Sequence, residues 1–557
     1  MADVDSGVSM ALSPAIGLAR VHRRCVPHDA ETPSSEMNST GFATCPKQVA
    51  FFFDFFLKFS YNTFGIRFAN SELVAAKEKL EIVKSRGEAA PNSRGVPRHR
   101  RRRNAFGLIQ EYCTHMKTNK TDNITLDFKV KGGKKLHGSI ATNFSKNGSV
   151  GLLCASLLNK GITTLHGIAR IEEVFRVIEI LQSIGAKVKW INQNSVQIIP
   201  PRNFKLKNIN VQSSVKTRSV VMLIGPLIHK LSSFSLPHAQ GCNLGRRTIA
   251  AHTYALEEFG VKIKTTSQNY EISTSKLKTA NIVMYESGDT ACENILTAAA
   301  LIQGITTISF ASANYMVQEV CFFLEALGVK VDGIGTSTLI VHGIKGINKD
   351  IEYWNSEDPI ESMMFISACI VTDSKLTITR CPIDFLSLEL EKLKRMNLKF
   401  KILKRYYSYN GRTKLADIEI FPSKLKALVD KIHSNPYPGI NIDNLPFFVP
   451  IAIRAKGQTM IHDWVYENRA IYFTELNRLG ANITLADPHR VYIIGGTKLR
   501  SAQIVCPPAL RPSMVILISM LAAEGTSILR NVYMINRGYE EIAKRLNSIG
   551  ADIKILK

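Results

Sequence analysis

Two groups of basic residues stand where a predicted strand meets a predicted helix. Lys146, with Asn147 beside it, follows the stretch GSIATNF and precedes a run of small and apolar residues. Lys216 and Arg218 stand just before the apolar segment SVVMLIGPL. Backbone N–H groups and the helix dipole favour anions at such a position, and a nearby cation adds to this preference. Both places are therefore candidate anion-binding sites, although solvated surface cations would give the same pattern.

A third candidate is the thiol of Cys242. This Cys stands in a glycine-rich polar loop, LPHAQGCNLGRRTIAAH, whereas the other nine lie mostly in apolar runs. The neighbouring Arg246 and Arg247 would favour the thiolate and lower the pKa of the thiol. A thiol of this kind on a loop can act as a nucleophile or as a general acid. An incidental loop Cys is the alternative interpretation.

The fourth candidate is the carboxylate of Asp443, which lies between a turn rich in Pro and Gly and an apolar segment predicted to be helical. It fits a general base or a helix N-cap. Arg469, Arg511 and Arg537 occupy corresponding loops in the last part of the chain. Their guanidinium groups could converge on a carboxylate or phosphate ligand, for which paired N–H donors are well suited. Three solvated surface Arg remain the simpler alternative.

The elements that must position these residues come from an internal repeat. Each copy starts with Gly and β-forming residues, passes through a polar loop, and continues with apolar residues three and four positions apart. The six copies span residues 161–188, 231–263, 304–331, 374–400, 457–483 and 525–553, the second and fourth being looser than the rest. A unit of this size cannot bury its own helix. The pattern predicts an α/β protein of six strand–helix–strand units that pack in threes, helices inside and sheets outside.

The first copy shows how each unit is expected to fold. Its predicted helix carries one apolar face, formed by Val174, Val177, Ile178, Leu181 and Ile184. A Gly follows the helix, as expected for a left-handed C-terminal position. The corresponding glycines of the four close copies are Gly185, Gly328, Gly480 and Gly550.

Composition limits the classes of protein to consider. With 557 residues, two or more domains are expected. No apolar run approaches the ~20 residues that span a bilayer, so a cytoplasmic protein without membrane insertion is predicted. The ten Cys show no metal-type spacing, which favours a reduced compartment, buried thiols and no metal site.

The net charge of +25 raises the possibility of nucleic-acid binding. The densest basic stretch, residues 94–103, lies in a Ser-, Pro- and Arg-rich extension, residues 1–122, which lacks periodicity and is expected to be partly disordered. This extension contains acidic residues, which disfavours an organelle-targeting segment. No stacking-aromatic or helix-turn-helix pattern accompanies the basic stretch. An anionic small molecule is therefore the favoured ligand, and nucleic acid the less favoured one.

Taken together, the motifs resemble those of the enolpyruvyl transferases. The likeness starts near Asn123 and runs to the C-terminus through Lys146-Asn147, KTRS…GPL, SLP…C..GRR…H, ENR, LR and INRGYE. It implies two similar domains, each an inside-out α/β barrel of three repeats, with the active site between them. One domain would span residues 146–355. The other would combine residues 123–145 with 356–557.

The resemblance also implies an activity that needs no cofactor. The enolpyruvyl group of phosphoenolpyruvate would pass to the 3-hydroxyl of UDP-N-acetylglucosamine with release of phosphate. This reaction would be the first committed step of peptidoglycan precursor synthesis. The protein is expected to be monomeric. The hydroxyl must lose a proton and the methylene carbon must gain one, so both a base and an acid are needed. Cationic side chains would stabilise the negative charge of the transition state.

The resemblance gives each candidate a role. Lys146 would contact phosphoenolpyruvate, and Asn147 would hold the sugar nucleotide. Cys242 would be the general acid, and the residue alkylated by fosfomycin-type epoxides. Asp443 would accept the proton of the sugar hydroxyl. The remaining substrate-binding positions would be Arg218, Arg247, His252, Arg469, Arg511 and Arg537.

Two alternatives stay open. The first is an enzyme of the 5-enolpyruvylshikimate-3-phosphate synthase type, which shares the fold but lacks the loop Cys. The second is a catalytically impaired paralogue with a binding role, because Ala250 and Ala509 stand where the family usually carries acidic residues.

Overall fold

The computed structural model describes residues 126–238 and 248–556, all of which belong to one unit, Lys120–Lys557. The predicted N-terminal extension, residues 1–122, lies outside the described residues. Cys242 and Arg247 lie outside them as well, within the segment 239–247.

The described strands form six sheets, of which five have four strands and share one plan. In each of these five, a parallel pair is extended on one side by two antiparallel strands, which form a hairpin in four of the sheets. In one of them, β9 (Asn281–Val283) runs parallel to β10 (Gly304–Ser309). β10 then pairs antiparallel with β12 (Thr338–Gly343), which pairs with β11 (Lys330–Asp332). The common plan is the structural counterpart of the sequence repeat.

Two more sheets repeat this order. They are β17 (Ile432–His433), β18 (Gly457–His462), β20 (Arg490–Gly495) and β19 (Asn482–Asp487), and β13 (Ile351–Trp354), β3 (Thr163–His166), β5 (Ser195–Ile199) and β4 (Lys187–Trp190). The three-stranded sheet contains β6 (Ser233–Pro237), β8 (Asn269–Thr274) and β7 (Val261–Thr265).

The remaining two sheets join the start of the described chain to its end. β1 (Asp127–Lys131) lies between β22 (Thr526–Arg530) and β23 (Ile553–Leu556), and β21 (Gln503–Val505) pairs with the other edge of β22. β2 (Ser139–Ala141) runs parallel to β14 (Leu376–Pro382), next to the hairpin formed by β15 (Lys399–Tyr407) and β16 (Lys414–Phe421).

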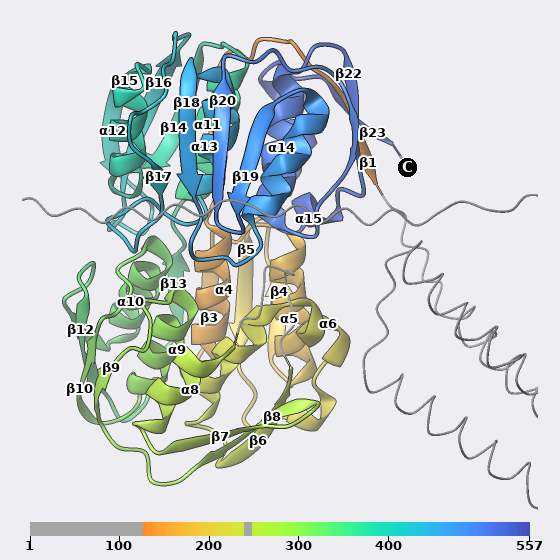
Figure 1. The fold of residues 1–557 in the computed structure, drawn as a ribbon. Coiled ribbons are helices and arrows are strands. Elements are labelled where there is room, and N and C mark those ends of the chain that lie inside the picture. The colour runs from red at the N-terminus through yellow and green to blue at the C-terminus, as the bar shows by residue number, and fades with distance from the viewer. Residues whose placement is uncertain (1–125, 239–247, 557) are drawn as a thin grey trace, which may run out of the picture. The chain divides into compact units, whose positions relative to one another are not determined.

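These pairings divide the described chain into two halves. Residues 146–355, from α4 to β13, are called the first half, and residues 126–145 with 356–556 the second half. β13 closes the first half because it pairs with β3, about 190 positions earlier in the sequence. In Figure 1 the first half runs from orange to green, and the second half runs from teal to blue except for residues 126–145, which are orange.

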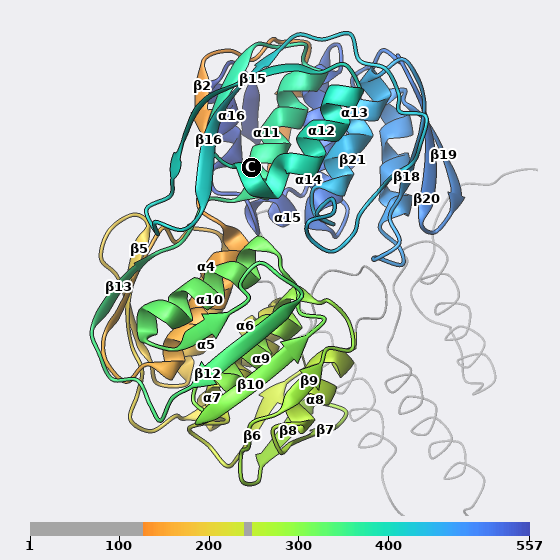
Figure 2. The ribbon, with the colours of Figure 1, turned by 90° about the vertical axis from the view of Figure 1, so that its left-hand side faces the viewer.

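The core of each half is made by helices that are buried on all sides. In the second half these are α11 (Pro359–Val371), α13 (Phe448–Arg454) and α14 (Leu510–Ala522), which contact one another. In the first half, α4 (Lys146–Ala155) and α7 (Ile224–Leu227) contact α9 (Asp289–Ala299). A helix that is apolar on every side is stable only inside a protein. Figures 1 and 2 show these helices lying inward of the strands.

A second set of helices carries the amphipathic pattern seen in the sequence. The set comprises α5 (Glu172–Ser183), α8 (Ala250–Glu257), α10 (Tyr315–Leu327), α12 (Ser387–Arg395), the 3-10 helix η6 (Ala470–Leu479), and α15 (Tyr533–Asn536) with α16 (Ile542–Ser548). The predicted apolar face of α5 is confirmed, because all five of its residues are buried. The positive φ angles of Gly185, Gly328, Gly480 and Gly550 confirm the predicted left-handed helix ends. In the copy at residues 457–483 the predicted helix is a 3-10 helix over residues 470–479.

The shorter helical elements connect these parts. They are α6 (Val211–Lys216) and the 3-10 helices η1 (Ser156–Leu158), η2 (Leu206–Asn208), η3 (Arg218–Leu223), η4 (Ile383–Leu386) and η5 (Leu445–Phe447). None of the helices in the described ranges has the length and apolar character needed to cross a membrane.

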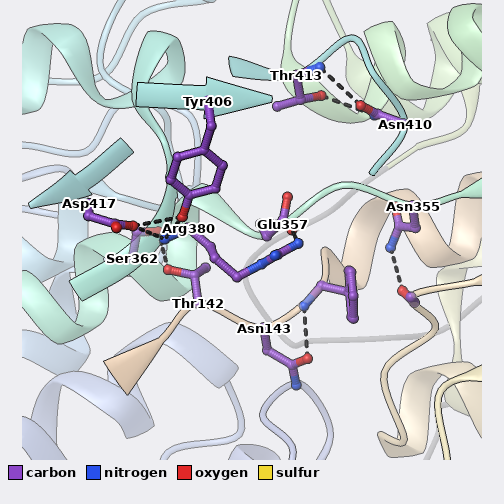
Figure 3. A network of polar contacts seen from close by, with 12 residues as sticks. Thr142, Asn143, Asn355, Glu357, Ser362, Arg380, Tyr406, Asn410, Thr413 and Asp417 are labelled. Atoms are coloured by element: carbon purple, nitrogen blue, oxygen red, sulfur yellow. Dashed lines mark hydrogen bonds and ion pairs between the residues drawn. The ribbon is translucent and has the colours of Figure 1, made fainter. Parts of the chain in front are cut away.

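The two chain crossings between the halves run side by side. Ser145 N–H donates to the carbonyl of Ser356 at 2.7 Å, and Asp358 N–H donates to the carbonyl of Asn143 at 2.8 Å. Figure 3 shows the polar side chains around this point, among them the ion pair between Arg380 and Glu357. The crossings are thus fixed to each other by backbone hydrogen bonds.

A long hairpin makes a further connection between the halves. β15 and β16 have nine and eight residues, more than any other described strand. At the hairpin tip, Asn410 Nδ2 donates to the carboxylate of Glu319 at 3.2 Å, and Arg412 pairs with Glu325, both on α10. The second half therefore holds α10 through this hairpin.

Candidate active site

Lys146 is the first residue of α4, as its place between a strand and a small-residue segment predicts. Ser145 caps the helix, because its Oγ accepts a hydrogen bond from Gly148 N–H at 2.9 Å. Lys146 N–H donates to Asp358 Oδ2 at 3.2 Å across the chain crossing. The Lys146 side chain is half-buried. A lysine held at a helix N-terminus and partly withdrawn from water is well placed to meet an anion.

Glu173 is a buried carboxylate in the first turn of α5 that gathers several donors. It accepts hydrogen bonds from the hydroxyls of Thr217 and Ser219 and, at 2.7 Å, from Arg537 Nε. Burial by itself would raise the pKa of Glu173, but the charges of Lys146 and Arg537 outweigh burial and bring the pKa below its usual value. Glu173 is therefore ionised and ties Arg537 of the second half to the first half.

Asp443 stands between two guanidinium groups. Arg511 Nη2 donates to Asp443 Oδ2 at 3.0 Å, and Arg469 Nη1 lies 3.7 Å from Asp443 Oδ1. Burial by itself would raise the pKa of this carboxyl. The charges of Arg511, Arg469 and Lys146 outweigh burial and hold the pKa of Asp443 below its usual value. Since η5 begins after Asn444 with no side-chain cap, Asp443 serves the ion pairs and does not cap a helix.

The two arginines beside Asp443 are themselves rigidly held. Arg469 is buried and binds Asp463 with two hydrogen bonds, at 2.5 and 3.0 Å, while its Nη2 also donates to the Ile442 carbonyl at 2.7 Å. Arg511 Nη1 donates to the hydroxyl of Tyr539 at 2.7 Å. Two or more hydrogen bonds from one guanidinium group fix that group in one orientation. Two of the three predicted arginines thus converge at Asp443, whereas Arg537 contacts Glu173.

Asn147, the second residue of α4, reaches the neighbouring helix of the first half. Its Nδ2 donates to the hydroxyl of Tyr315 at 3.0 Å. The ring of Tyr315 packs edge-on against Phe385 of the second half, with centroids 5.9 Å apart. Asn147 is therefore oriented by a residue that also touches the opposite half.

Arg218 and His252 form a separate group in the first half. Arg218, the first residue of η3, donates from Nη2 to the carbonyl of Thr248 at 2.6 Å, directly after the segment 239–247. His252 is buried on α8, with Nδ1 3.1 Å from Asn294 Nδ2. Burial, followed by the nearby charge of Arg218, lowers the pKa of His252 to about 3, so this ring is neutral at pH 7.

The thiols of the described residues are all unsuited to acid–base work. Six Cys are described, and each is buried and unpaired, which confirms for these six the prediction of buried thiols: Cys154, Cys292, Cys321, Cys369, Cys381 and Cys506. Burial raises the pKa of every one of them. A thiol with a raised pKa is a poor nucleophile and a poor metal ligand.

Several residues of this group were not identified from the sequence. Glu173 stands next to Glu172 in the first turn of a helix, where acidic residues are common because they interact with the helix dipole. Tyr539 and Asp463 show no local signal, although Tyr539 lies two positions after Arg537 in the motif INRGYE. Tyr315 stands at the start of an apolar helix, where it is indistinguishable from a core residue.

The chemistry that this arrangement supports is acid–base chemistry on an anionic ligand. One ionised carboxylate, Asp443, lies among fixed cations, and Lys146 is close enough to act on it electrostatically. Within the two described ranges, no set of three or more His, Cys, Asp or Glu could hold a metal ion. Fixed cations around a base suit a ligand with carboxylate or phosphate groups that must lose a proton nearby.

Comparisons with known proteins agree with this chemistry. A family model described as EPSP synthase (3-phosphoshikimate 1-carboxyvinyltransferase) matches residues 130–546. A protein of Bradyrhizobium diazoefficiens named UDP-N-acetylglucosamine 1-carboxyvinyltransferase is 32% identical over 437 residues, which cover 77% of this chain and 98% of that protein. A protein of the same name from Treponema denticola is 31% identical, with 77% and 99% covered.

Solved structures show the same fold. The enolpyruvyl transferase NikO from Streptomyces tendae superposes with a TM-score of 0.67 at 20% identity, covering 78% of this chain and 99% of that one. EPSP synthase from Acinetobacter baumannii gives a TM-score of 0.61 at 19% identity, covering 78% and 100%. The α/β fold expected from the repeats is therefore confirmed.

Proposed function

This chain belongs to the enolpyruvyl transferase family, and we propose that it transfers the enolpyruvyl group of phosphoenolpyruvate to the 3-hydroxyl of UDP-N-acetylglucosamine, with release of phosphate. The name carried by its relatives supports the acceptor. The observation that carries the proposal is the ionised carboxylate of Asp443, fixed between Arg469 and Arg511 and near Lys146. A base surrounded by cations is what the addition of a hydroxyl to an anionic enol requires.

The proposal includes a division into two domains, each an inside-out α/β barrel of three repeats. Residues 146–355 would form one domain, and residues 123–145 with 356–557 the other. The shared sheet plan and the buried inner helices support this division. So do the pairings of β1 with β22 and β23 and of β2 with β14, which bring the start of the described chain into the second half. The active site would lie between the domains, and residues 1–122 would precede both.

In the proposed reaction Asp443 takes the proton of the sugar 3-hydroxyl, while the oxygen of that hydroxyl bonds to the central carbon of phosphoenolpyruvate. The methylene carbon receives a proton and becomes a methyl group, and Cys242 is the proposed donor of that proton. In the second step the C–O bond to phosphate breaks, phosphate leaves, and the methyl group returns a proton to restore the double bond. The low pKa of Asp443 keeps this group ready in its basic form.

The cations have proposed binding roles. Lys146, Arg469, Arg511 and Arg537 would hold the carboxylate and phosphate of phosphoenolpyruvate. The hydrogen bonds that fix the guanidinium groups of the three arginines support that role, since preorganised donors lose little freedom on binding. The remaining proposed contacts are to the sugar nucleotide or the phosphates, from Asn147, Arg218, Arg247 and His252.

The test is phosphate release by the purified full-length protein given phosphoenolpyruvate and one of two acceptors. With UDP-N-acetylglucosamine we expect phosphate and a product heavier than the acceptor by one enolpyruvyl group, detected by mass spectrometry. Release only with shikimate 3-phosphate would replace the proposal by the second candidate, which the description of the matching family model favours. Binding of UDP-N-acetylglucosamine without release of phosphate would show an impaired paralogue.

A further inference from the structure

Asn441, two residues before Asp443, links the proposed base to the first half. Its Oδ1 accepts a hydrogen bond from Asp443 N–H at 2.8 Å, and its Nδ2 donates to Asn314 Oδ1 at 3.2 Å. The two ends of the amide therefore have different partners, one on its own loop and one across the halves. Because Asn oxygen and nitrogen are not interchangeable as hydrogen-bonding groups, these contacts fix the orientation of the amide.

Asn314 continues the same line of hydrogen bonds into the first half. Its Nδ2 donates to Asp289 Oδ2 at 3.1 Å, and Ser312 Oγ donates to the other carboxylate oxygen of Asp289 at 2.6 Å. Asn314 is buried and is also the N-cap of α10, where its Oδ1 accepts from Tyr315 N–H at 2.9 Å. Burial raises the pKa of Asp289 to about 6. A chain of three side chains thus runs from Asp289 to the backbone of Asp443.

The segment 312–315, at the start of α10, also orients a residue on the proposed acceptor side of the site. Tyr315 follows Asn314 directly, and its hydroxyl accepts the hydrogen bond from Asn147 Nδ2 at 3.0 Å. Residues 312–315 therefore contact Asn147 in the first half and, through Asn441, Asp443 in the second. The segment 312–315 would therefore help to position both the acceptor hydroxyl, through Asn147, and the base Asp443, through Asn441.

We propose that Asn441 and Asn314 are positioning residues, which set Asp443 against the acceptor hydroxyl by a relay of hydrogen bonds between the halves. This inference rests on the proposed function. Arg511 and Arg469 hold the carboxylate of Asp443, whereas Asn441 holds its backbone, so the relay controls where the carboxylate stands and not its charge. A displacement of about 1 Å at a reacting group can lower a rate about 100-fold.

The test is a double-mutant cycle in the full-length protein with Asn441→Ala and Asn314→Ser. Ser keeps an oxygen able to cap α10 but is too short to reach Asn441. We expect each single variant to lower kcat on the order of 10-fold, with an unchanged KM for the sugar nucleotide because the contact between Asn147 and Tyr315 remains. The double variant should be no slower than the slower single variant, since both changes break one relay. Effects that multiply, or an unchanged kcat in Asn441→Ala, would overturn the proposal.

Asn477→Ala is the matched control. The side-chain amide of Asn477 also has two partners, the carbonyl and the N–H of Ile483, both at 2.9 Å, and among the described residues both of these contacts lie within the second half and away from Asp443. Its kcat should equal that of the parent. If the parent releases phosphate with neither acceptor, the proposed function fails, and the relay is then judged by thermal unfolding. In that case the melting temperature of the double variant should match that of the less stable single variant, and additive shifts would overturn the relay.

Discussion

The guanidinium of Arg511, the second residue of α14, donates a hydrogen bond at 3.0 Å to the carboxylate of Asp443, which lies 68 positions earlier in the sequence. Tyr539 holds the other end of the same guanidinium at 2.7 Å. The pairing keeps Asp443 ionised despite burial, so it explains how a carboxyl inside the protein can serve as a base at neutral pH.

Replacing Arg511 by Gln should therefore change both the rate and its pH dependence. Loss of the positive charge raises the pKa of Asp443, so the acidic limb of the kcat/KM profile moves to higher pH. Loss of a fixed donor should also lower kcat about 100-fold. The measurement is phosphate release across a pH series. Arg490→Gln, which breaks an exposed pair with Asp487, is the control, and a profile identical to that control would contradict the role of Arg511.

Alkylation should distinguish Cys242 from the six described Cys. Burial raises the thiol pKa at those six positions, for example to about 12 at Cys292 and Cys506, so they should react slowly in the folded protein. We expect brief treatment with iodoacetamide to label Cys242 and to abolish phosphate release, as read by peptide mass spectrometry and the activity assay. Full activity in Cys242→Ala would show that the thiol is not the proton donor.

The inner helices of the first half should not tolerate a methyl group at Gly225. A Cβ there would meet Thr297 and the backbone of Asn294 on α9, and Gly225 N–H already donates to Asn294 Oδ1 at 2.7 Å. We expect Gly225→Ala to lower the free energy of unfolding by about 1–3 kcal/mol in a denaturant titration. At Gly346 the new methyl group has open space around it, so Gly346→Ala should change the free energy of unfolding by less than about 0.5 kcal/mol. Equal stability of both variants would contradict the packing of α7 against α9.

Glu319, which holds the tip of the long hairpin, should make stability depend on pH. Burial raises the pKa of this carboxyl from 4.5 to about 7. Between these values the folded protein keeps a proton that the unfolded chain has released, so the contribution of Glu319 to stability falls as pH rises through this window. Glu319→Gln removes the titration. The melting temperature of the variant relative to the parent should rise from about pH 5 to about pH 8, and a constant difference would contradict the raised pKa.

The local sequence pattern was sufficient to predict the amphipathic helices and the residues at which they end. On α5 the spacing of Val174, Val177 and Leu181 marked the buried face, and Gly185 marked the turn that follows. The inner helices gave no such signal. α11 is buried on every side and shows no polar face, so periodicity could not separate it from a strand or assign it to the core of a half.

Long-range pairing was beyond the reach of local pattern. Nothing near β1 indicates that its partners are β22 and β23, about 400 positions later. Motifs identified Lys146, Asp443 and Arg511 because each stands at an element boundary. The residues that orient them, such as Asn441 and Tyr539, depend on contacts between distant segments and could be found only in the structure.

The central claim, an enolpyruvyl transfer with Asp443 as the base, is tested most directly by phosphate release in Asp443→Asn beside the parent. Both proteins receive phosphoenolpyruvate and UDP-N-acetylglucosamine, and Asp332→Asn, a change at a partly exposed residue at the end of β11, is the control. We predict release by the parent and the control, and a rate about 1,000-fold lower in Asp443→Asn, which keeps its melting temperature within a few degrees. Release by Asp443→Asn at the parental rate would contradict the account.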